Sequence, residues 1–488
     1  MSTNTTPHRV TLIDGDGIGP EVVSAARRII EAAGVKIDWE PAKAGAEVFK
    51  AGIASGVPQD TMESIARTGV AFKGPLETPV GFGEKSANVT LRKLFELYAN
   101  IRPCIELPGI KTPFSGRGID LVVIRENVED VYAGIEHMQS PGVAQCLKLI
   151  TRKGCEKIVR VAFELAVAEG RKKVTCATKS NIMKFTEGLL KRTFEEIAPE
   201  YNARGIASEH VIIDNCAHQL VRRPEQFDVM VMTNMNGDIV SDLTSGLTGG
   251  LGLAPSANIG NSAVMFEAVH GSAPDIAGQG KANPTASVLS AVMMLRHLKE
   301  FDAAAKIEQA VFITLAEGKN LPGDIAAGRP TGTTTQFTDT VIANIGRSFD
   351  GYKPRAHQPI KLPVLDARPD YVRVKTRSVV GIDLFIESGV SPTEMGESLN
   401  ALAKGSALKL KMISNRGVQV YPVPVGGKTD CVDHYRCRFM AVDGSASLTD
   451  AQIYEAVSRI GAKHMWMHIE KLQVLDGVTG YSKAQGED

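Results

Sequence analysis

Polar side chains that can hold a small polyanion surround the start of one expected helix. Ser86 and Asn88 come first, Arg92 follows one turn later, and Arg102 lies just beyond the helix. Apolar residues at helical spacing define the helix, namely Leu91, Leu94, Phe95 and Tyr98. A helix start favours negative charge, and guanidinium groups can bind carboxylates through two hydrogen bonds. The pattern predicts a site for a molecule with several carboxylates, with an ordinary helix cap and solvated arginines as the alternative.

A pair of aspartates four residues apart indicates a cation site. Asp238 and Asp242 follow the apolar run 229–233 and share one face of an expected helix. Carboxylates at this spacing repel each other unless a cation neutralises them. Asp214 closes another strand-like run, 211–213, and could supply a third carboxylate. An all-oxygen site suits Mg²⁺ or Mn²⁺ better than zinc, although most such pairs are simply solvated or cap a helix.

Three further residues have side chains suited to charge binding or proton transfer. Arg125 ends the buried-strand pattern 120–125, and Tyr132 follows seven residues later. Lys179 lies between an expected strand and an expected helix. Taken alone, a loop lysine is usually a solvated surface charge. A lysine near other cations can have its pKa lowered towards the working range, which would allow it to take up a proton from a substrate hydroxyl.

Together these motifs closely resemble those of the isocitrate dehydrogenases, a branch of the decarboxylating dehydrogenases of β-substituted malates. The resemblance covers about residues 8–345. It implies metal-dependent oxidative decarboxylation of isocitrate to 2-oxoglutarate and CO₂. Within that family the residues that match the substrate-binding positions are Thr78, Ser86, Asn88, Arg92, Arg102 and Arg125. The sequence before the helix does not look like that of isopropylmalate dehydrogenases, which place a hydrophobic-pocket sequence there.

The resemblance also implies the catalytic and metal-binding residues. Lys179 matches the catalytic lysine and Tyr132 the catalytic tyrosine, which would protonate the enolate left after CO₂ departs; the division of proton transfers between them stays open. Asp238 and Asp242 match ligands of Mg²⁺ or Mn²⁺, and Asp214 matches the ligand that the neighbouring subunit gives. The active site would therefore be completed only in a homodimer or a higher homo-oligomer.

A segment of small residues with one histidine, residues 267–284, matches the part of the family that surrounds the adenosine half of the nicotinamide cofactor. By itself it would be read as an ordinary turn. The implied cofactor residues are Glu267, His270, Gly271, Ala273, Asp275, Ile276 and Asn283. The glycine-rich turn at 15–19 does not have the spacing of the Rossmann dinucleotide fingerprint, and we assign no cofactor to it.

Two residues of this segment favour NAD over NADP in the sequence. Asp275 and Ile276 stand where many NADP-dependent relatives have lysine and tyrosine. A carboxylate at 275 can accept a hydrogen bond from the 2′-hydroxyl of NAD and would repel the 2′-phosphate of NADP. Lys281 and Arg329 lie in segments that could supply positive charge instead. We expect NAD, with NADP as the alternative.

Composition limits the class of protein. The 488 residues contain 55 basic and 55 acidic side chains, so no net charge attracts nucleic acid or an anionic membrane. No apolar run approaches the roughly 20 residues that span a bilayer, and the N-terminus lacks a hydrophobic signal segment, so we expect a cytoplasmic protein without membrane or nucleic-acid partners. The seven cysteines are scattered, which fits reduced thiols.

Alternating strand and helix patterns predict an α/β protein with the two-domain isocitrate/isopropylmalate dehydrogenase-type fold. By resemblance, residues 1–97 and 250–348 form a large cofactor-binding domain, and 98–249 a small substrate and dimer domain with a clasp at about 131–174. A proline-rich linker follows at 349–375. The pattern βαββαβ then predicts a C-terminal ferredoxin-like module over 376–488, as in the long, Thermus-type isocitrate dehydrogenases.

Several alternatives stay open at this point. A sister enzyme acting on isopropylmalate, homoisocitrate or tartrate would share most of the motifs. The order βαββαβ also occurs in RNA-recognition motifs, but the strand 433–439 has no Lys/Arg-Gly-Phe-like pattern, and we reject that function. The C-terminal module could be a regulatory domain that binds a small molecule, or it could pack between subunits and stabilise the oligomer.

Overall fold

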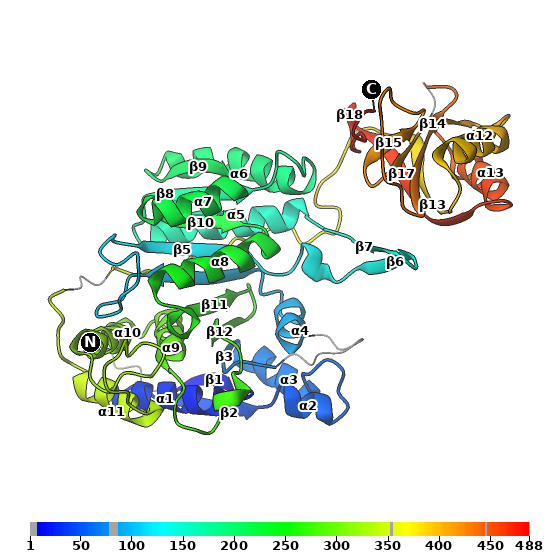
Figure 1. The fold of residues 1–488 in the computed structure, drawn as a ribbon. Coiled ribbons are helices and arrows are strands. Elements are labelled where there is room, and N and C mark those ends of the chain that lie inside the picture. Colours follow the sequence, from blue (N-terminus) through cyan, green and yellow to red (C-terminus); the bar gives the residue numbers. More distant parts are fainter. Residues whose placement is uncertain (1–6, 78–85, 352–354, 445–446, 488) are drawn as a thin grey trace. The chain divides into compact units, whose positions relative to one another are not determined.

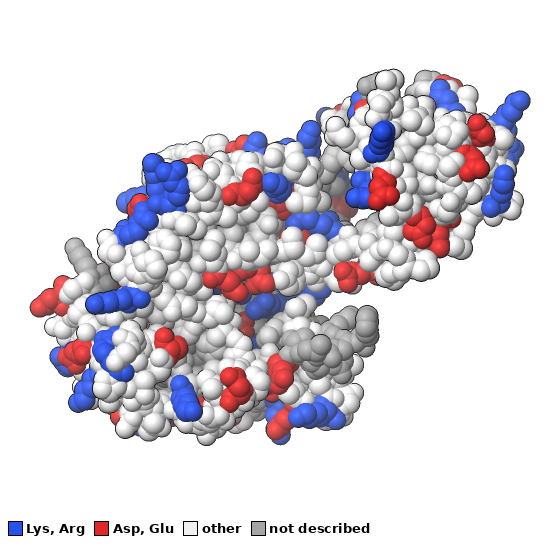
Figure 2. All heavy atoms as spheres, in the orientation of Figure 1, with Lys and Arg blue, Asp and Glu red and all other residues white. Residues whose placement is uncertain are grey.

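The computed structural model describes residues 7–77, 86–351, 355–444 and 447–487. The chain forms two compact units, and Figure 1 shows their elements. Unit 1 contains Met1–Ala133 and Lys148–Asp366, and unit 2 contains Gly134–Leu147 and Ala367–Asp488. No helix of the described residues is long and apolar enough to cross a membrane. Figure 2 shows basic and acidic side chains interspersed on the visible face, in line with their equal numbers.

Unit 1 is built on one ten-stranded sheet in the order β2-β1-β3-β12-β11-β4-β5-β10-β8-β9. β11 runs antiparallel to β12 and β4, and β4 runs antiparallel to β5; the other neighbours are parallel. The strands are β1 (His8–Ile13), β2 (Ile37–Ala42), β3 (Val70–Lys73), β4 (Ala99–Ile105), β5 (Asp120–Glu126), β8 (Lys173–Thr178), β9 (Ala207–Ile212), β10 (Val229–Met232), β11 (Pro255–Ile259) and β12 (Val264–Ala268).

Helices cover both faces of this sheet. The helices of unit 1 are α1 (Gly19–Ala32), α2 (Ala46–Lys50), α3 (Gln59–Thr68), α4 (Ala87–Leu94), α5 (Arg152–Ala168), α6 (Thr186–Asn202), α7 (Ile213–Arg222), α8 (Asn234–Thr248), α9 (Thr285–His297), α10 (Phe301–Glu317) and α11 (Thr334–Asn344). Short 3₁₀ turns are η1 (Val131–Ala133), η2 (Pro224–Gln226), η3 (Leu251–Leu253) and η4 (Pro274–Ile276). The expected strand 211–213 ends one residue early, because Ile213 already begins α7. Asp214 therefore lies in the first turn of a helix.

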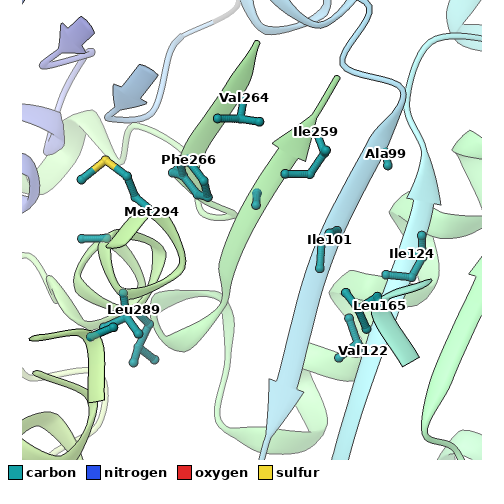
Figure 3. Packing of buried hydrophobic residues seen from close by; sticks show 14 of the residues in the cluster. Ala99, Ile101, Val122, Ile124, Leu165, Ile259, Val264, Phe266, Leu289 and Met294 are labelled. Atoms are coloured by element: carbon teal, nitrogen blue, oxygen red, sulfur yellow. The ribbon is translucent and has the colours of Figure 1, made fainter. Parts of the chain in front are cut away.

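The apolar run of β5 is explained by burial on both of its faces. Val122 and Ile124 join the large core cluster, which includes Leu165 of α5, as Figure 3 shows. Leu121 and Val123 join a second cluster with Val240 of α8. Successive strand residues point to opposite faces, so a strand covered on both sides reads as a continuous apolar run. The apolar run ends at Arg125, whose side chain is also buried.

The C-terminal part of unit 2 is a six-stranded antiparallel sheet with two helices. Its order is β15-β14-β16-β13-β17-β18. The elements are β13 (Arg377–Glu387), α12 (Pro392–Ala403), β14 (Leu408–Asn415), β15 (Val418–Tyr421), β16 (His434–Ala441), α13 (Asp450–Gly461), β17 (Met465–Leu475) and β18 (Val478–Thr479). Ser391 and Thr449 begin the two helices as capping boxes. β14 and β15 are neighbouring antiparallel strands joined by a short turn.

The expected fold class is thus confirmed, with the mixed α/β sheet in unit 1 and the ferredoxin-like order of strands in unit 2. Unit 2 also takes in the hairpin of β6 (Glu136–Ser140) and β7 (Val143–Cys146), which lies far away in the sequence. Part of the proline-rich segment packs on unit 1, because Pro363 O accepts a hydrogen bond from Asn261 Nδ2 at 3.0 Å. Ile360 and Leu362 pack against the core of that unit.

Candidate active site

Two arginines, one tyrosine and two aspartates meet where β4, β5 and α8 come together. Arg102 Nη1 lies 3.2 Å from Asp242 Oδ1, and Arg102 Nη2 lies 3.5 Å from Asp238 Oδ1. Arg125 forms an ion pair with Asp238. The Tyr132 hydroxyl donates to Asp238 Oδ2 at 2.5 Å. The structure therefore brings five of the expected site residues into direct contact.

Burial and neighbouring charge set the electrostatics of this cluster. Burial, together with repulsion from Arg102 and Arg92, lowers the pKa of Arg125 to about 10. Burial and the hydrogen bond to Asp238 raise the pKa of Tyr132 above its usual range. Neighbouring cations disfavour the charged form of an arginine, and nearby carboxylates favour it. The cluster therefore has a local affinity for an anion with several carboxylates, and it holds Tyr132 protonated.

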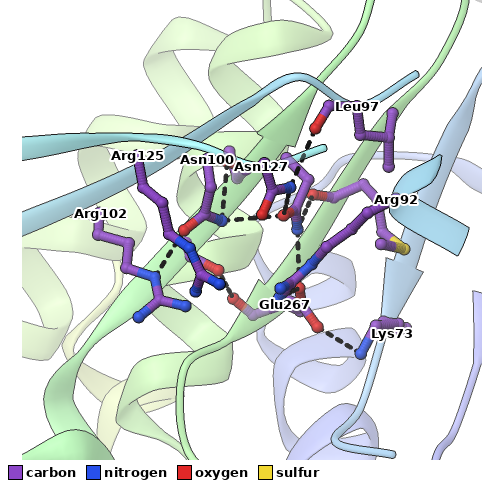
Figure 4. Close-up of polar contacts among 12 residues, drawn as sticks. Lys73, Arg92, Leu97, Asn100, Arg102, Arg125, Asn127 and Glu267 are labelled. Carbon is purple, nitrogen blue, oxygen red and sulfur yellow. Dashed lines mark hydrogen bonds and ion pairs between the residues drawn. The ribbon is translucent and has the colours of Figure 1, made fainter. Parts of the chain in front are cut away.

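A buried network extends this cluster towards β12, and Figure 4 shows it. Arg92 Nη2 donates to Glu267 Oε1 at 3.0 Å, and Lys73 forms an ion pair with the other oxygen of the same carboxylate. Asn258 Nδ2 donates to Glu267 Oε1 at 2.7 Å. Burial opposes the charge of Glu267, but Lys73 and Arg92 hold its pKa well below the usual range. Lys73 was not among the residues assigned from the sequence; the signal for it is a lysine at the end of an apolar strand.

The helix predicted after Ser86 is present as α4, with Ser86 at its N-cap position. It ends at Leu94, so Tyr98 lies beyond it. The Asn88 Oδ1 atom is buried and has no hydrogen-bond partner among the described residues. An unpaired buried amide costs free energy unless a ligand or water bonds to it. Asn88 Oδ1 can thus accept a hydrogen bond from water or from a donor group of a ligand, whereas the expected Thr78 lies outside the described residues.

Lys179 and Asp214 form a separate pair. Lys179 Nζ lies 2.7 Å from Asp214 Oδ1, and this hydrogen bond lowers the pKa of the Asp214 carboxyl. Among the described residues, no hydrogen bond or ion pair joins either side chain to Asp238 or Asp242. Within one chain, the described residues contain no group of three or more His, Cys, Asp or Glu side chains placed to hold a metal ion. Within one chain, Asp214 therefore does not join Asp238 and Asp242 in a common metal site.

A pocket of about 570 Å³ lies beside the small-residue segment that the sequence indicated for the cofactor. Of the expected residues, those that line it are His270, Gly271, Ala273, Ile276 and Asn283. Burial lowers the pKa of His270, and its Nε2 atom has no partner among the described residues. Ile18 of the glycine-rich turn also lines the pocket, and its N–H bonds to Ser272 O at 2.8 Å. The turn thus supports this segment through its backbone.

Charges around this pocket differ from those expected. Asp275 is exposed and is not among the lining residues, and its carbonyl accepts a hydrogen bond from Gln279 Nε2 at 2.8 Å. Lys281 is exposed and lines the pocket, as does Asp324, and Lys281 Nζ donates to Gln279 Oε1 at 2.9 Å. Arg329 points elsewhere, donating to Ala326 O at 3.0 Å and Gly109 O at 3.3 Å. The wall of the pocket therefore carries the lysine and not the carboxylate of Asp275.

Comparison with known proteins identifies the family to which this sheet and its cluster of acids and bases belong. The family model described as isocitrate/isopropylmalate dehydrogenase matches residues 9–341. The chain belongs to this family. A second model, described as the C-terminal domain of bacterial isocitrate dehydrogenase, matches residues 377–487.

Full-length relatives are similar to this chain along both units. A Thermus thermophilus protein named isocitrate dehydrogenase (NADP) is 60% identical over 98% of this chain and 96% of its own. A Rickettsia conorii protein of the same name is 41% identical over 98% and 99%. A crystal structure of a protein from Thermus thermophilus superposes with a TM-score of 0.95 at 58% identity, covering 100% of this chain and 98% of the other.

The preference for NAD drawn from Asp275 and Ile276 is wrong, because these full-length relatives are named for NADP. The residue types at 275 and 276 suggested repulsion of a phosphate, but repulsion depends on where the carboxylate points. Asp275 is exposed outside the pocket lining, whereas Lys281 lies in it. Sequence spacing could not distinguish these two positions.

Proposed function

We propose that this protein catalyses the oxidative decarboxylation of isocitrate to 2-oxoglutarate and CO₂ with NADP as the oxidant. One observation carries the proposal: Arg102, Arg125 and Tyr132 meet the paired carboxylates Asp238 and Asp242 at the ends of neighbouring strands. The names of the full-length relatives support the same reaction. A tricarboxylate is the class of substrate that such a density of arginines fits.

Substrate binding would use side chains from three elements. Arg102 and Arg125 would each exchange part of their ion pairing with the aspartates for carboxylates of isocitrate. Arg92 has an unpaired buried Nε atom, which leaves it a donor for the same ligand. Asn88 and Ser86 at the start of α4 would bind the γ-carboxylate, with the amide Nδ2 of Asn88 as the donor, because the start of a helix favours negative charge.

Asp238 and Asp242 would hold a divalent cation, Mg²⁺ or Mn²⁺, because both are oxygen ligands on one face of α8. Such a cation, when bound, supplies Lewis-acid stabilisation of negative charge on the substrate. We propose that Asp214 reaches this site from the partner subunit of a homodimer. Since Lys179 is ion-paired with Asp214, the two residues would arrive together.

The proton transfers then fall to Lys179 and Tyr132. Lys179, brought close to the arginines, is suited to take the proton from the substrate hydroxyl as hydride leaves. Loss of CO₂ from the β-position leaves an enolate that needs a proton on carbon. Tyr132 keeps its proton because its pKa is raised, and it therefore suits the role of general acid.

The oxidant would lie along the small-residue segment. NADP accepts the hydride of the reaction. His270 and Asn283 line the adenosine pocket, and the buried, unpaired Nε2 of His270 can bond to the adenine or ribose. We propose that the Lys281 ammonium pairs with the 2′-phosphate, because it is the positive group in the pocket lining.

Initial rates test the proposal. Purified protein is given isocitrate, isopropylmalate, homoisocitrate or tartrate, each with Mg²⁺ or Mn²⁺ and with NADP or NAD. We expect kcat/KM to be highest for isocitrate with NADP and to vanish in excess chelator. Higher kcat/KM for a sister substrate, or for NAD, would contradict the substrate or the cofactor assignment respectively.

A further inference from the structure

Asn258 of β11 lies at the centre of a buried amide network in unit 1. Asn258 and Asn100 of β4 are both 0% exposed, and they lie opposite each other where the two strands pair. Asn258 Oδ1 accepts from Asn100 Nδ2 at 2.9 Å and from Asn127 Nδ2 at 3.0 Å. Asn258 Nδ2 donates to Glu267 Oε1 at 2.7 Å and to Met265 O at 3.3 Å. Both polar atoms of the Asn258 amide are therefore fully bonded.

Two charged residues fix the direction of the hydrogen bonds in this network. Arg102 Nε can only donate, and Asn100 Oδ1 accepts from it at 2.6 Å. The Nδ2 atom of Asn100 must then face Asn258. At the other end, Glu267 is ionised because its pKa lies well below the usual range, so it can only accept. Each amide therefore accepts on the side of Arg102 and donates on the side of Glu267.

The amide network connects two arginines of the candidate active site. At one end, Glu267 also accepts from Arg92 Nη2 at 3.0 Å, and Figure 4 shows this carboxylate between the network and Arg92. At the other end, Asn100 binds Arg102 through Nε, whereas the Nη atoms of Arg102 meet the aspartates of α8. When a substrate carboxylate replaces an aspartate at the Nη atoms, the bond at Nε can therefore remain.

We infer that Asn258 is a positioning residue that fixes the spacing of Arg92 and Arg102 for the carboxylates of isocitrate. The inference rests on the proposed function. Asn258 acts through the two arginines, since it is fully buried and its four hydrogen bonds are all made to protein groups. A guanidinium group binds a carboxylate through a planar fork, so its orientation decides how well both hydrogen bonds form.

The first test is the Asn258→Leu variant of the full-length protein. Leucine has the branched shape of asparagine but neither a donor nor an acceptor. Steady-state kinetics and calorimetric titration with isocitrate in the presence of Mg²⁺ are compared with those of the parent. We expect KM and Kd for isocitrate to rise about 10-fold, the effect of weakening one charge-assisted hydrogen bond. The kcat value should fall less than about 3-fold, because arginines that bind ground state and transition state alike affect mainly KM.

A second variant carries the test if the leucine variant does not fold. Asn258→Asp has the size of asparagine and keeps an acceptor for Asn100. Its ionised carboxylate cannot donate to Glu267 and repels it. The KM for isocitrate should therefore rise in this variant also, by about 10-fold or more.

A double-mutant cycle tests the route through Arg102. Arg102→Lys keeps the positive charge but has no Nε atom for Asn100 to bind. In the Arg102→Lys background, the Asn258 change should therefore raise KM by less than about 3-fold, because residues that act through one another are not additive.

Asn344→Leu is the matched control for the loss of a buried asparagine. Asn344 of α11 is 4% exposed, and its Nδ2 atom donates to Thr314 Oγ1 at 2.9 Å. Its replacement should lower Tm but leave KM for isocitrate unchanged, because its partners Thr314 and Arg347 are not residues of the candidate active site. Rates are taken at a temperature at which calorimetry shows every variant folded.

The outcomes distinguish this inference from the proposed function. If the parent does not oxidise isocitrate, the proposed function fails before the variants are compared. If the parent is active and the Asn258 variants keep the parental KM, Asn258 does not position the arginines. An equal rise in KM in the parent and in the Arg102→Lys background would also contradict the inference, because Asn258 would then not act through Arg102.

Discussion

The Tyr132 hydroxyl donates a hydrogen bond to Asp238 Oδ2 at 2.5 Å, which links the expected general acid to an expected metal ligand. The two residues come from different elements, η1 and the first turns of α8. The guanidinium carbon of Arg125 lies over the Tyr132 ring, 5.1 Å from the ring centroid. Burial and the hydrogen bond to Asp238 raise the pKa of Tyr132 and keep it protonated, whereas the charge of Arg125 opposes this effect.

Replacement of Tyr132 by phenylalanine should lower kcat by about 100-fold or more, because a positioned general acid contributes about 10²–10⁴-fold. KM for isocitrate should change little, since the arginines remain. The measurement is steady-state kinetics followed by absorbance of the reduced cofactor. The control is Tyr454→Phe, at an exposed position of α13. An active Tyr132→Phe enzyme would exclude this residue as the proton donor.

Asp242→Asn should weaken binding of Mn²⁺ because it replaces an anionic ligand by a neutral one. Calorimetric titration of Mn²⁺ in the presence of isocitrate measures this without relying on turnover. Asp302→Asn, on the surface of α10, is the control and should bind Mn²⁺ as the parent does. Equal Mn²⁺ affinity in the Asp242→Asn variant and the parent would remove Asp242 from the metal site.

Asn88→Leu should reduce kcat/KM for isocitrate by roughly 10- to 150-fold, the effect of losing one charge-assisted hydrogen bond worth about 1.5–3 kcal/mol. The reason is that the Nδ2 group of Asn88 can donate to a substrate carboxylate, whereas leucine has no donor. Asn88→Gln retains the amide, so its kcat/KM for isocitrate should fall less than that of the leucine variant. Unchanged kinetics in the leucine variant would show that α4 does not contact the substrate.

Lys281→Ala should lower kcat/KM for NADP by about 10- to 150-fold, on the same scale for a charge-assisted bond, and that for NAD by far less. The lysine lines the adenosine pocket, whereas Asp275 does not. Lys319→Ala, at an exposed position after α10, serves as the control. A similar loss with both cofactors would mean that Lys281 does not meet the 2′-phosphate.

Glu169 provides a test of stability against pH. Burial opposes its charge, but His357 and Arg171 lower its pKa to about 2, and Arg171 Nε lies 2.7 Å away. A carboxyl with a folded-state pKa below its unfolded value stabilises the protein above the unfolded pKa, and this contribution is lost as pH falls towards the folded value. Glu169→Gln should therefore cost up to about 3 kcal/mol at pH 7.

The difference in Tm between this variant and the parent, measured by calorimetry, should be largest near neutral pH and should shrink as pH falls below about 4.5, the usual value for glutamate. The comparison uses the first unfolding transition of each protein. A difference that does not change between pH 7 and pH 4 would show that the ionised carboxylate is not the source of the stability.

The sequence alone was enough to predict the strands and helices whose periodicity is strong. The run 120–125 became part of β5 because both faces of that strand are buried. Residue types also marked Asp238 and Asp242 as a carboxylate pair at i and i+4, but their meeting with Arg102 and Arg125 is a long-range contact. Patterns of this kind involve residues close together in the sequence, so they can be recognised without the tertiary structure.

Tertiary structure decided what depends on direction and on long-range contact. Lys73 became part of the site only because β3 lies beside β12, which brings its ammonium to Glu267. Asp275 and Lys281 lie six residues apart, and only the path of the backbone through η4 determines which of them lines the pocket. The contact between Ser140 and Asp433 spans 293 residues. Hydrogen bonds between distant segments form only when burial of apolar surfaces brings those segments together. The periodicity of the sequence therefore does not predict this contact.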